Sequence, residues 1–252
     1  MSTLHTHADF HSDVLDASRT VIVYTPGSYG RDTRRRFPVL LLHDGQNVFD
    51  GKTAYVPGES WRMRETADEL IHRRRIEPLI IAAVYHGGEK RIREYTPGRA
   101  GKLHGRMVVD ELLPFLHERY RTLTQARHTG IGGSSLGGLS ALWLGLEYPQ
   151  VFGKLAVLSP SVWWGQRAIL KYVQALQQPQ RQRMWLDMGT AEGEKPFHSI
   201  RDARLLKAML VTKGWREGST LHYSEVGGAD HSERAWAARA PEMLEFLYPR
   251  KR

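Results

Sequence analysis

The 252-residue sequence predicts an α/β protein with a mostly parallel central sheet and helices on both of its faces. Two observations lead to this prediction. Short apolar runs typical of buried strands alternate with longer runs of helical spacing, which is the pattern of parallel α/β sheets. The chain also contains no recognisable linker, repeat or low-complexity tract, so its length suits one domain over residues 1–252.

Each predicted element follows from its residues. The strand-like runs are short and apolar, and they cover 20–24, 37–42, 78–85, a run through Ile131, 155–158, 184–188 and 221–226. The helix-like runs have apolar residues at helical spacing, and they cover 61–74, 107–120, 139–148, 168–176, 203–213 and 233–247. Pro114 lies within the second of these helices, where a kink is expected. We expect His5 and His7 to lie in a loosely held N-terminus.

Composition excludes several classes of protein. Hydrophobic residues make up 41% and charged residues 25%, which is ordinary for a soluble globular chain. No apolar run approaches the roughly 18 residues of a membrane span, and the polar start does not resemble a secretory signal. Because there are no cysteines, disulfides and thiolate chemistry are excluded. We therefore expect a cytoplasmic protein without a membrane partner.

The net charge of +9 raises the question of nucleic-acid binding. The basic residues are scattered, and the local clusters at 34–36 and 73–75 are not interleaved with aromatic residues. No nucleic-acid-binding module is recognisable. A solvated basic surface explains the charge better than a nucleic-acid partner.

The segment 132–138 reads Gly-Gly-Ser-Ser-Leu-Gly-Gly and contains a G-x-S-x-G motif centred on Ser135. The run through Ile131 precedes it and the helix-like run 139–148 follows it, which is the strand–turn–helix context of a nucleophile elbow. Glycines two residues to either side allow a strained turn to pack closely. The sequence therefore predicts Ser135 as a nucleophile at the carboxyl edge of the sheet.

A serine nucleophile needs a general base at neutral pH. Among the 12 histidines, His231 is the one that follows a strand late in the chain, in a glycine-bearing loop before the last helix. His222 lies inside the preceding strand and His198 begins a helix. Because serine, acid, histidine is the chain order in hydrolases with this elbow, His231 is the predicted base.

The acid is expected after the strand 184–188, where three carboxylates compete. Asp187 lies inside the strand, Glu192 follows the turn at Gly189, and Glu194 lies further out. We favour Glu192, with Asp187 as the alternative. Its role would be to hold the imidazole tautomer and to stabilise the imidazolium.

Two backbone N–H groups are candidates for an oxyanion hole. Leu136 follows the serine at the start of a helix, where N–H groups are free to bind an anion. The loop after the strand 37–42 contains Asp44 and Gly45, and a glycine lets the backbone approach the substrate. The N–H of Gln46 is therefore the expected second donor.

Together these residues resemble the putative esterase family of α/β hydrolases, which includes siderophore, feruloyl and acetylxylan esterases, S-formylglutathione hydrolases and mycolyltransferases. The matching segments cover nearly the whole chain in order: 41–50, 91–97, 132–138, 159–164, 186–192 and 230–233. The resemblance implies the α/β-hydrolase fold, with Ser135 as nucleophile, His231 as base, Glu192 as acid and the Gln46 amide in the oxyanion hole. Several relatives have aspartate at the acid position, and some siderophore esterases use a Ser–His pair.

The sequence thus predicts a serine carboxylesterase for short-chain or aromatic esters that needs no metal or cofactor. Trp163 and Trp164 are candidates for an acyl or aromatic pocket, although core packing explains them equally well. Arg93 is a candidate for holding an anionic catecholate, together with Arg91, Arg99 and Lys102 in the long loop between Tyr85 and Arg106, although solvated surface charge explains these cations better. A siderophore trilactone esterase is the second hypothesis, and a non-catalytic binding module is the alternative of another class. The sequence leaves the oligomeric state open, and a homo-oligomer is possible.

Overall fold

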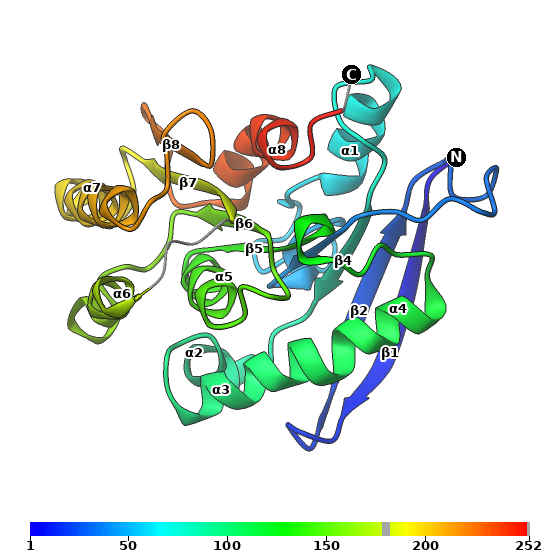
Figure 1. Cartoon of the computed structure of the whole chain (residues 1–252), viewed down its shortest axis with the longest axis horizontal. Coiled ribbons are helices and arrows are strands. Elements are labelled where there is room, and N and C mark those ends of the chain that lie inside the picture. Colours follow the sequence, from blue (N-terminus) through cyan, green and yellow to red (C-terminus); the bar gives the residue numbers. More distant parts are fainter. Residues whose placement is uncertain (178–181, 251–252) are drawn as a thin grey trace.

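The structure, a computed structural model, describes residues 1–177 and 182–250. Its centre is an eight-stranded sheet with the order β1-β2-β4-β3-β5-β6-β7-β8 (Figure 1). The strands are β1 (Thr3–Ser12), β2 (Ala17–Thr25), β3 (Val39–Leu42), β4 (Ile80–Val84), β5 (Thr129–Ser134), β6 (Lys154–Leu158), β7 (Arg183–Gly189) and β8 (Leu221–Val226). Strands β3 to β8 are parallel, and β1 and β2 form an antiparallel edge. The predicted mostly parallel sheet is confirmed.

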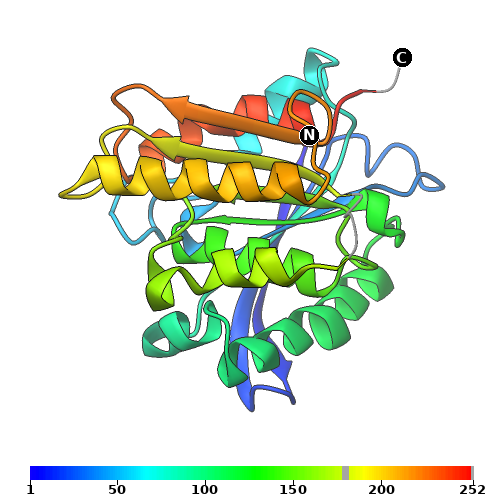
Figure 2. The ribbon, with the colours of Figure 1, turned by 60° about the vertical axis from the view of Figure 1, so that its left-hand side comes forward.

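Helices cover both faces of this sheet, as predicted (Figures 1 and 2). One face carries α1 (Met63–His72) and α8 (Glu233–Leu247). The other carries α3 (Arg99–Arg106), α4 (Leu113–Arg119), α5 (Leu136–Glu147), α6 (Trp164–Ala175) and α7 (Pro196–Thr212). Shorter elements are α2 (Arg91–Glu94) and the 3₁₀ turns η1 (Gly45–Asn47), η2 (Gly88–Lys90) and η4 (Ala126–His128).

The core consists of two apolar layers separated by the sheet. Along β3, Val39 and Leu41 face the layer under α5, whereas Leu40 and Leu42 face the layer under α1 and α8. Because side chains alternate between the faces of a strand, a strand buried on both sides is apolar throughout. Since β3 to β8 are parallel, the residues that follow these strands meet at one edge of the sheet.

The N-terminus differs from the sequence prediction, because it forms a strand instead of a loose segment. β1 pairs with β2 in antiparallel register, and Nε2 of His7 lies 2.7 Å from the Tyr120 hydroxyl. β1 is an edge strand, and most of its residues are exposed or only partly buried. The apolar alternation that would have predicted it is therefore missing.

The predicted helix over 107–120 is longer than expected at its N-terminal side. It starts as α3 and continues through a π-helical turn, η3 (Met107–Leu112), into α4. Pro114 is the second residue of α4. Proline has no N–H to donate to the preceding turn, and a π turn changes which N–H groups must pair. The chain thus accommodates the proline by a local widening of the helix.

Candidate active site

Ser135 lies at a strained turn between β5 and α5. Its φ of 56° and ψ of −123° are unusual for a residue with a side chain, and its N–H donates to the Leu158 carbonyl at 3.1 Å. The turn is possible because Gly133 is bare: a Cβ there would lie 2.7 Å from the Gly137 carbonyl carbon. The sequence therefore uses glycine to let the turn pack closely enough to lift the serine above the sheet edge.

His231 and Glu192 form a hydrogen-bonded pair at the same edge. Nδ1 of His231, in the loop between β8 and α8, lies 2.7 Å from Oε2 of Glu192. Glu192 is only 3% exposed, and its Oε1 accepts from the Gly189 N–H at 2.6 Å and from the Ser159 hydroxyl at 2.5 Å. Both carboxylate oxygens are thus occupied by donors, which holds the carboxylate in one orientation.

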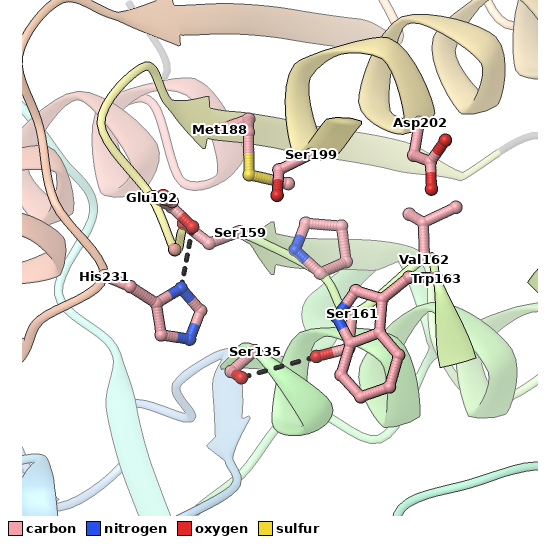
Figure 3. A pocket seen from close by; sticks show the side chains of 12 residues that line it. Ser135, Ser159, Ser161, Val162, Trp163, Met188, Glu192, Ser199, Asp202 and His231 are labelled. Carbon is pink, nitrogen blue, oxygen red and sulfur yellow. Dashed lines mark hydrogen bonds and ion pairs between the residues drawn. The ribbon is translucent and has the colours of Figure 1, made fainter. Parts of the chain in front are cut away.

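The imidazole and the serine share a pocket (Figure 3). Ser135, Glu192 and His231 all line a cavity of about 230 Å³, together with apolar side chains such as Val162 and Met188. The ring nitrogen of His231 that is not bonded to Glu192 is turned toward Ser135 (Figure 3). The Ser135 hydroxyl contacts Oγ of Ser161 at 3.4 Å in this structure.

Asp187, the alternative acid, is engaged elsewhere. It is fully buried in β7 and accepts from Arg239 Nη1 at 2.7 Å, from Trp185 Nε1 at 2.6 Å and from the Ser159 N–H at 3.1 Å. Burial raises the pKa of Asp187 to about 6, and Arg239 limits this rise. Its oxygens are therefore committed to three donors, and it is Glu192 that contacts His231.

Ser159, the first residue after β6, connects these groups. Its hydroxyl donates to Glu192 and accepts from Trp236 Nε1 at 3.0 Å and from Arg239 Nη2 at 3.2 Å. The Trp236 ring also stands edge-on to the His231 ring, with centroids 4.9 Å apart. Sequence reasoning missed this network. Only the position of Ser159 directly after a strand could have indicated it.

The loop after β3 carries one of the two expected oxyanion donors, the Gln46 N–H, and is held by α2. Asp44 adopts a left-handed conformation, and Arg91 donates to both of its carboxylate oxygens at 2.7 Å. The Asp44 N–H donates to the Tyr95 hydroxyl at 3.2 Å. These contacts fix η1, where Gln46 and Ser135 line a second cavity of about 410 Å³.

Both candidate amides lie at the start of a helix or 3₁₀ turn, where N–H groups lack an intrahelical acceptor. Leu136 is the first residue of α5, so its N–H has no acceptor within the helix. Gln46 precedes the first N–H groups that bond within η1, which are those of Asn47 and Val48. Both amides are therefore suited to hold the negative charge that develops on an ester oxygen.

The three predicted substrate-binding residues lie in three different environments. Trp163 is 63% exposed and lines the cavity of about 230 Å³ (Figure 3). Trp164 is half-buried and packs against the core under α5, as the packing explanation predicted. Arg93 is exposed on α2, and its neighbour Arg91 lines the second cavity instead. The sequence prediction selected Arg93 from the cations of this segment, although the helical spacing of Arg91 and Tyr95 distinguishes Arg91.

Residues 1–177 and 182–250 contain neither a metal-binding cluster nor a membrane-spanning helix. In this part of the chain, no group of three or more His, Asp or Glu side chains is arranged to hold a metal ion. None of its helices is long and apolar enough to cross a membrane.

The fold and the strained serine beside an imidazole–carboxylate pair are those of an α/β hydrolase. A sequence model of the family described as Putative esterase matches residues 12–247, and the chain belongs to this family. The resemblance predicted from the sequence is thereby confirmed.

Individual relatives differ in how much of their length the chain covers. The chain is 25% identical over 252 residues to the uncharacterized protein YbbA of Bacillus subtilis (strain 168), covering 93% of this chain and 94% of that protein. It is 33% identical over 156 residues to the iron(III) enterobactin esterase of Dickeya dadantii (strain 3937), covering 62% of this chain and 33% of that protein. The match therefore spans about a third of the length of that esterase.

Solved structures show the same fold. A ferulic acid esterase superposes with a TM-score of 0.77 at 17% identity and covers 98% of both chains. The enterobactin esterase from Shigella flexneri, solved in the presence of enterobactin, superposes with a TM-score of 0.78 at 24% identity. That match covers 98% of this chain and 58% of the Shigella chain.

Proposed function

We propose that the protein is a serine carboxylesterase that forms an acyl-enzyme on Ser135. The observation that carries this proposal is the 2.7 Å pair of Glu192 and His231, whose imidazole faces the same cavity as the strained serine. An oriented base beside a nucleophile, with backbone donors nearby, is the arrangement that acyl transfer requires. Membership of the esterase family supports the same reaction class.

The reaction proceeds by two displacements at the ester carbonyl. Ser135 Oγ attacks the carbonyl carbon while Nε2 of His231 takes the hydroxyl proton, and the carbonyl electrons move onto oxygen. The N–H groups of Leu136 and Gln46 hold this oxyanion. Its collapse breaks the ester bond, and the alcohol leaves with the proton from His231. Water then repeats the cycle on the acyl group and releases the acid and free serine.

The proposed acid is Glu192, and the buried network keeps it in place. Glu192 accepts the Nδ1–H of His231, so it selects the tautomer whose Nε2 is free to take a proton. Arg239 neutralises Asp187 and donates to Ser159, which in turn donates to Glu192. We infer that Arg239 and Ser159 are positioning residues that act through Glu192.

A siderophore esterase is the second candidate. The observation that favours it is the similarity to iron(III) enterobactin esterases, one of which is 33% identical over 156 residues. The cationic side chains are less favourable. Arg91 is occupied by Asp44, and Arg93 is exposed on α2. These two arginines therefore do not form a preformed site for an anionic catecholate.

A panel of esters tests both candidates. We would measure hydrolysis of p-nitrophenyl acetate, p-nitrophenyl octanoate, methyl ferulate and a ferric catecholate trilactone by the wild type and by Ser135→Ala. The matched control is Ser140→Ala, because Ser140 is buried in α5 and its hydroxyl has no partner among the described residues. We expect Ser135→Ala to abolish hydrolysis and Ser140→Ala to retain it.

Labelling provides an independent measurement. A p-nitrophenyl phosphonate should add covalently to Ser135, as peptide mass spectrometry would show, and Ser135→Ala should stay unlabelled. Hydrolysis that survives in Ser135→Ala would reject the acyl-enzyme. A preference for the trilactone of more than about a hundredfold in kcat/KM over simple esters would favour the siderophore candidate.

A further inference from the structure

One carboxylate beside the nucleophile has no role in the proposed reaction. Glu233, the first residue of α8, is only 6% exposed and lines the cavity of about 410 Å³ that Ser135 and His231 also line. Asn47 Nδ2 donates to its Oε1 at 2.9 Å, and Oδ1 of the same Asn47 side chain accepts the Tyr55 N–H at 2.9 Å. The carboxylate is therefore held at a defined place on the cavity wall.

Glu233 forms no direct ion pair within the described part of the chain, and the guanidinium of Arg91 in the same cavity is bound by Asp44. Arg91 and His231 act on the Glu233 carboxylate only from beyond ion-pair distance. Burial raises the pKa of Glu233, and the carboxylates of Glu59 and Asp44 add to this rise, whereas a hydrogen bond from its own backbone N–H and the nearby His231 limit it. The start of α8 stabilises a negative charge only modestly, and buried carboxylates are normally paired with a cation.

A second polar group in the wall of this cavity lacks a hydrogen-bond partner. Gln46 is 9% exposed and lines the cavity, and its side-chain oxygen has no hydrogen-bond partner among residues 1–177 and 182–250. Trp236 and Tyr55 also line this cavity. A carboxylate without a direct ion-pair partner, an amide oxygen without a hydrogen-bond partner and aromatic rings together match a positively charged hydrogen-bond donor.

We propose that this cavity binds a protonated amine of the ester substrate, with Glu233 as its counter-charge. The inference rests on the proposed esterase function and names the substrate class for it. The cavity has three carboxylates, Asp44, Glu89 and Glu233, against the single guanidinium of Arg91. This balance attracts a cationic ester and repels an anionic ferric catecholate.

Two pairs of esters test the proposal. Within each pair, one ester has a protonated dimethylamino group where the other has an uncharged isopropyl group of the same shape. The first pair, 2-(dimethylamino)ethyl butyrate and 3-methylbutyl butyrate, places the amine in the alcohol. The second pair, methyl 4-(dimethylamino)butanoate and methyl 5-methylhexanoate, places it in the acyl group. We would measure kcat/KM at pH 7 by pH-stat for the wild type, Glu233→Gln and Glu118→Gln. The last variant removes the same charge from an exposed position on α4.

The wild type and Glu118→Gln should prefer the amine ester about tenfold in at least one pair, as a charge-assisted hydrogen bond provides. Glu233→Gln should remove most of this preference and change hydrolysis of the hydrocarbon ester by less than about threefold. A wild type that hydrolyses p-nitrophenyl acetate but shows no amine preference in either pair would overturn the inference. So would a preference that persists in Glu233→Gln. Loss of all ester hydrolysis would instead reject the proposed function.

Discussion

Replacing Glu192 by glutamine keeps the shape of the side chain and tests whether its carboxylate sets the proton position on His231. Oε1 of Glu192 accepts from the Gly189 N–H at 2.6 Å and from the Ser159 hydroxyl at 2.5 Å. The amide oxygen of the glutamine must take this place to satisfy both donors. Its NH₂ group then faces Nδ1 of His231 and donates to it. The ring proton is thereby moved to Nε2, which can no longer accept the proton of Ser135.

The expected loss follows from this change of tautomer. An imidazole fixed in the wrong tautomer costs a serine hydrolase about 10⁴-fold in kcat, because only the oxyanion donors and substrate binding continue to act. Glu192 is 3% exposed and faces His231. We therefore expect KM to change by less than about threefold.

The assay compares kcat and the pre-steady-state burst of p-nitrophenolate for the wild type and Glu192→Gln. Glu194→Gln is the matched control, because it removes the same charge from an exposed residue of the same loop. The control should retain wild-type kcat. A folded Glu192→Gln protein with more than about a tenth of wild-type kcat would refute the assignment. A larger loss in folded Asp187→Asn would transfer the role to Asp187.

Three further predictions concern the surroundings of the site. Arg239→Met leaves Asp187 buried without its cation and should lower the free energy of unfolding in urea by about 3–5 kcal/mol; unchanged stability would contradict the buried pair. Arg91→Met releases the Asp44 loop and should lower kcat about tenfold, whereas an effect on KM alone would contradict the clamp. Burial lowers the pKa of His104 from 6.5 to about 3, so the unfolded chain binds a proton across this range and the folded chain does not. Stability should therefore fall as the pH decreases from about 6.5, and His104→Leu should reduce this dependence by about one proton; an unchanged slope in urea titrations would contradict this.

The elements with strong local signals were predictable. The runs 221–226 and 233–247 coincide with β8 and α8, because Gly227 and Gly228 end the strand and the Ser232 hydroxyl caps the helix by accepting the Ala235 N–H. The elbow was predictable for the same reason, since its glycines are required within a few residues of Ser135. A single sequence shows where the backbone requires a glycine at a turn or a capping side chain at a helix start.

The supporting contacts were not predictable, because they join distant positions. Arg239 lies 52 residues from Asp187, and Arg91 lies 47 residues from Asp44. Nothing in the local pattern pairs these groups. The sequence prediction placed Arg91 and Arg93 in one loop, where nothing distinguishes the two side chains. Once it is known to be helical, Arg91 and Tyr95 fall on one side, four residues apart, and Arg93 does not.

The concentration of site groups on α8 affects when the enzyme can begin to work. His231 lies just before this helix, and Trp236 and Arg239 lie within it. A nascent chain that has not released residue 239 from the ribosome lacks the contacts that hold the proposed base, His231, and the proposed acid, Glu192. The elbow alone would then be catalytically silent, so hydrolysis should begin abruptly late in synthesis instead of increasing with chain length. Proteolytic removal of the same helix should likewise silence the whole site at once.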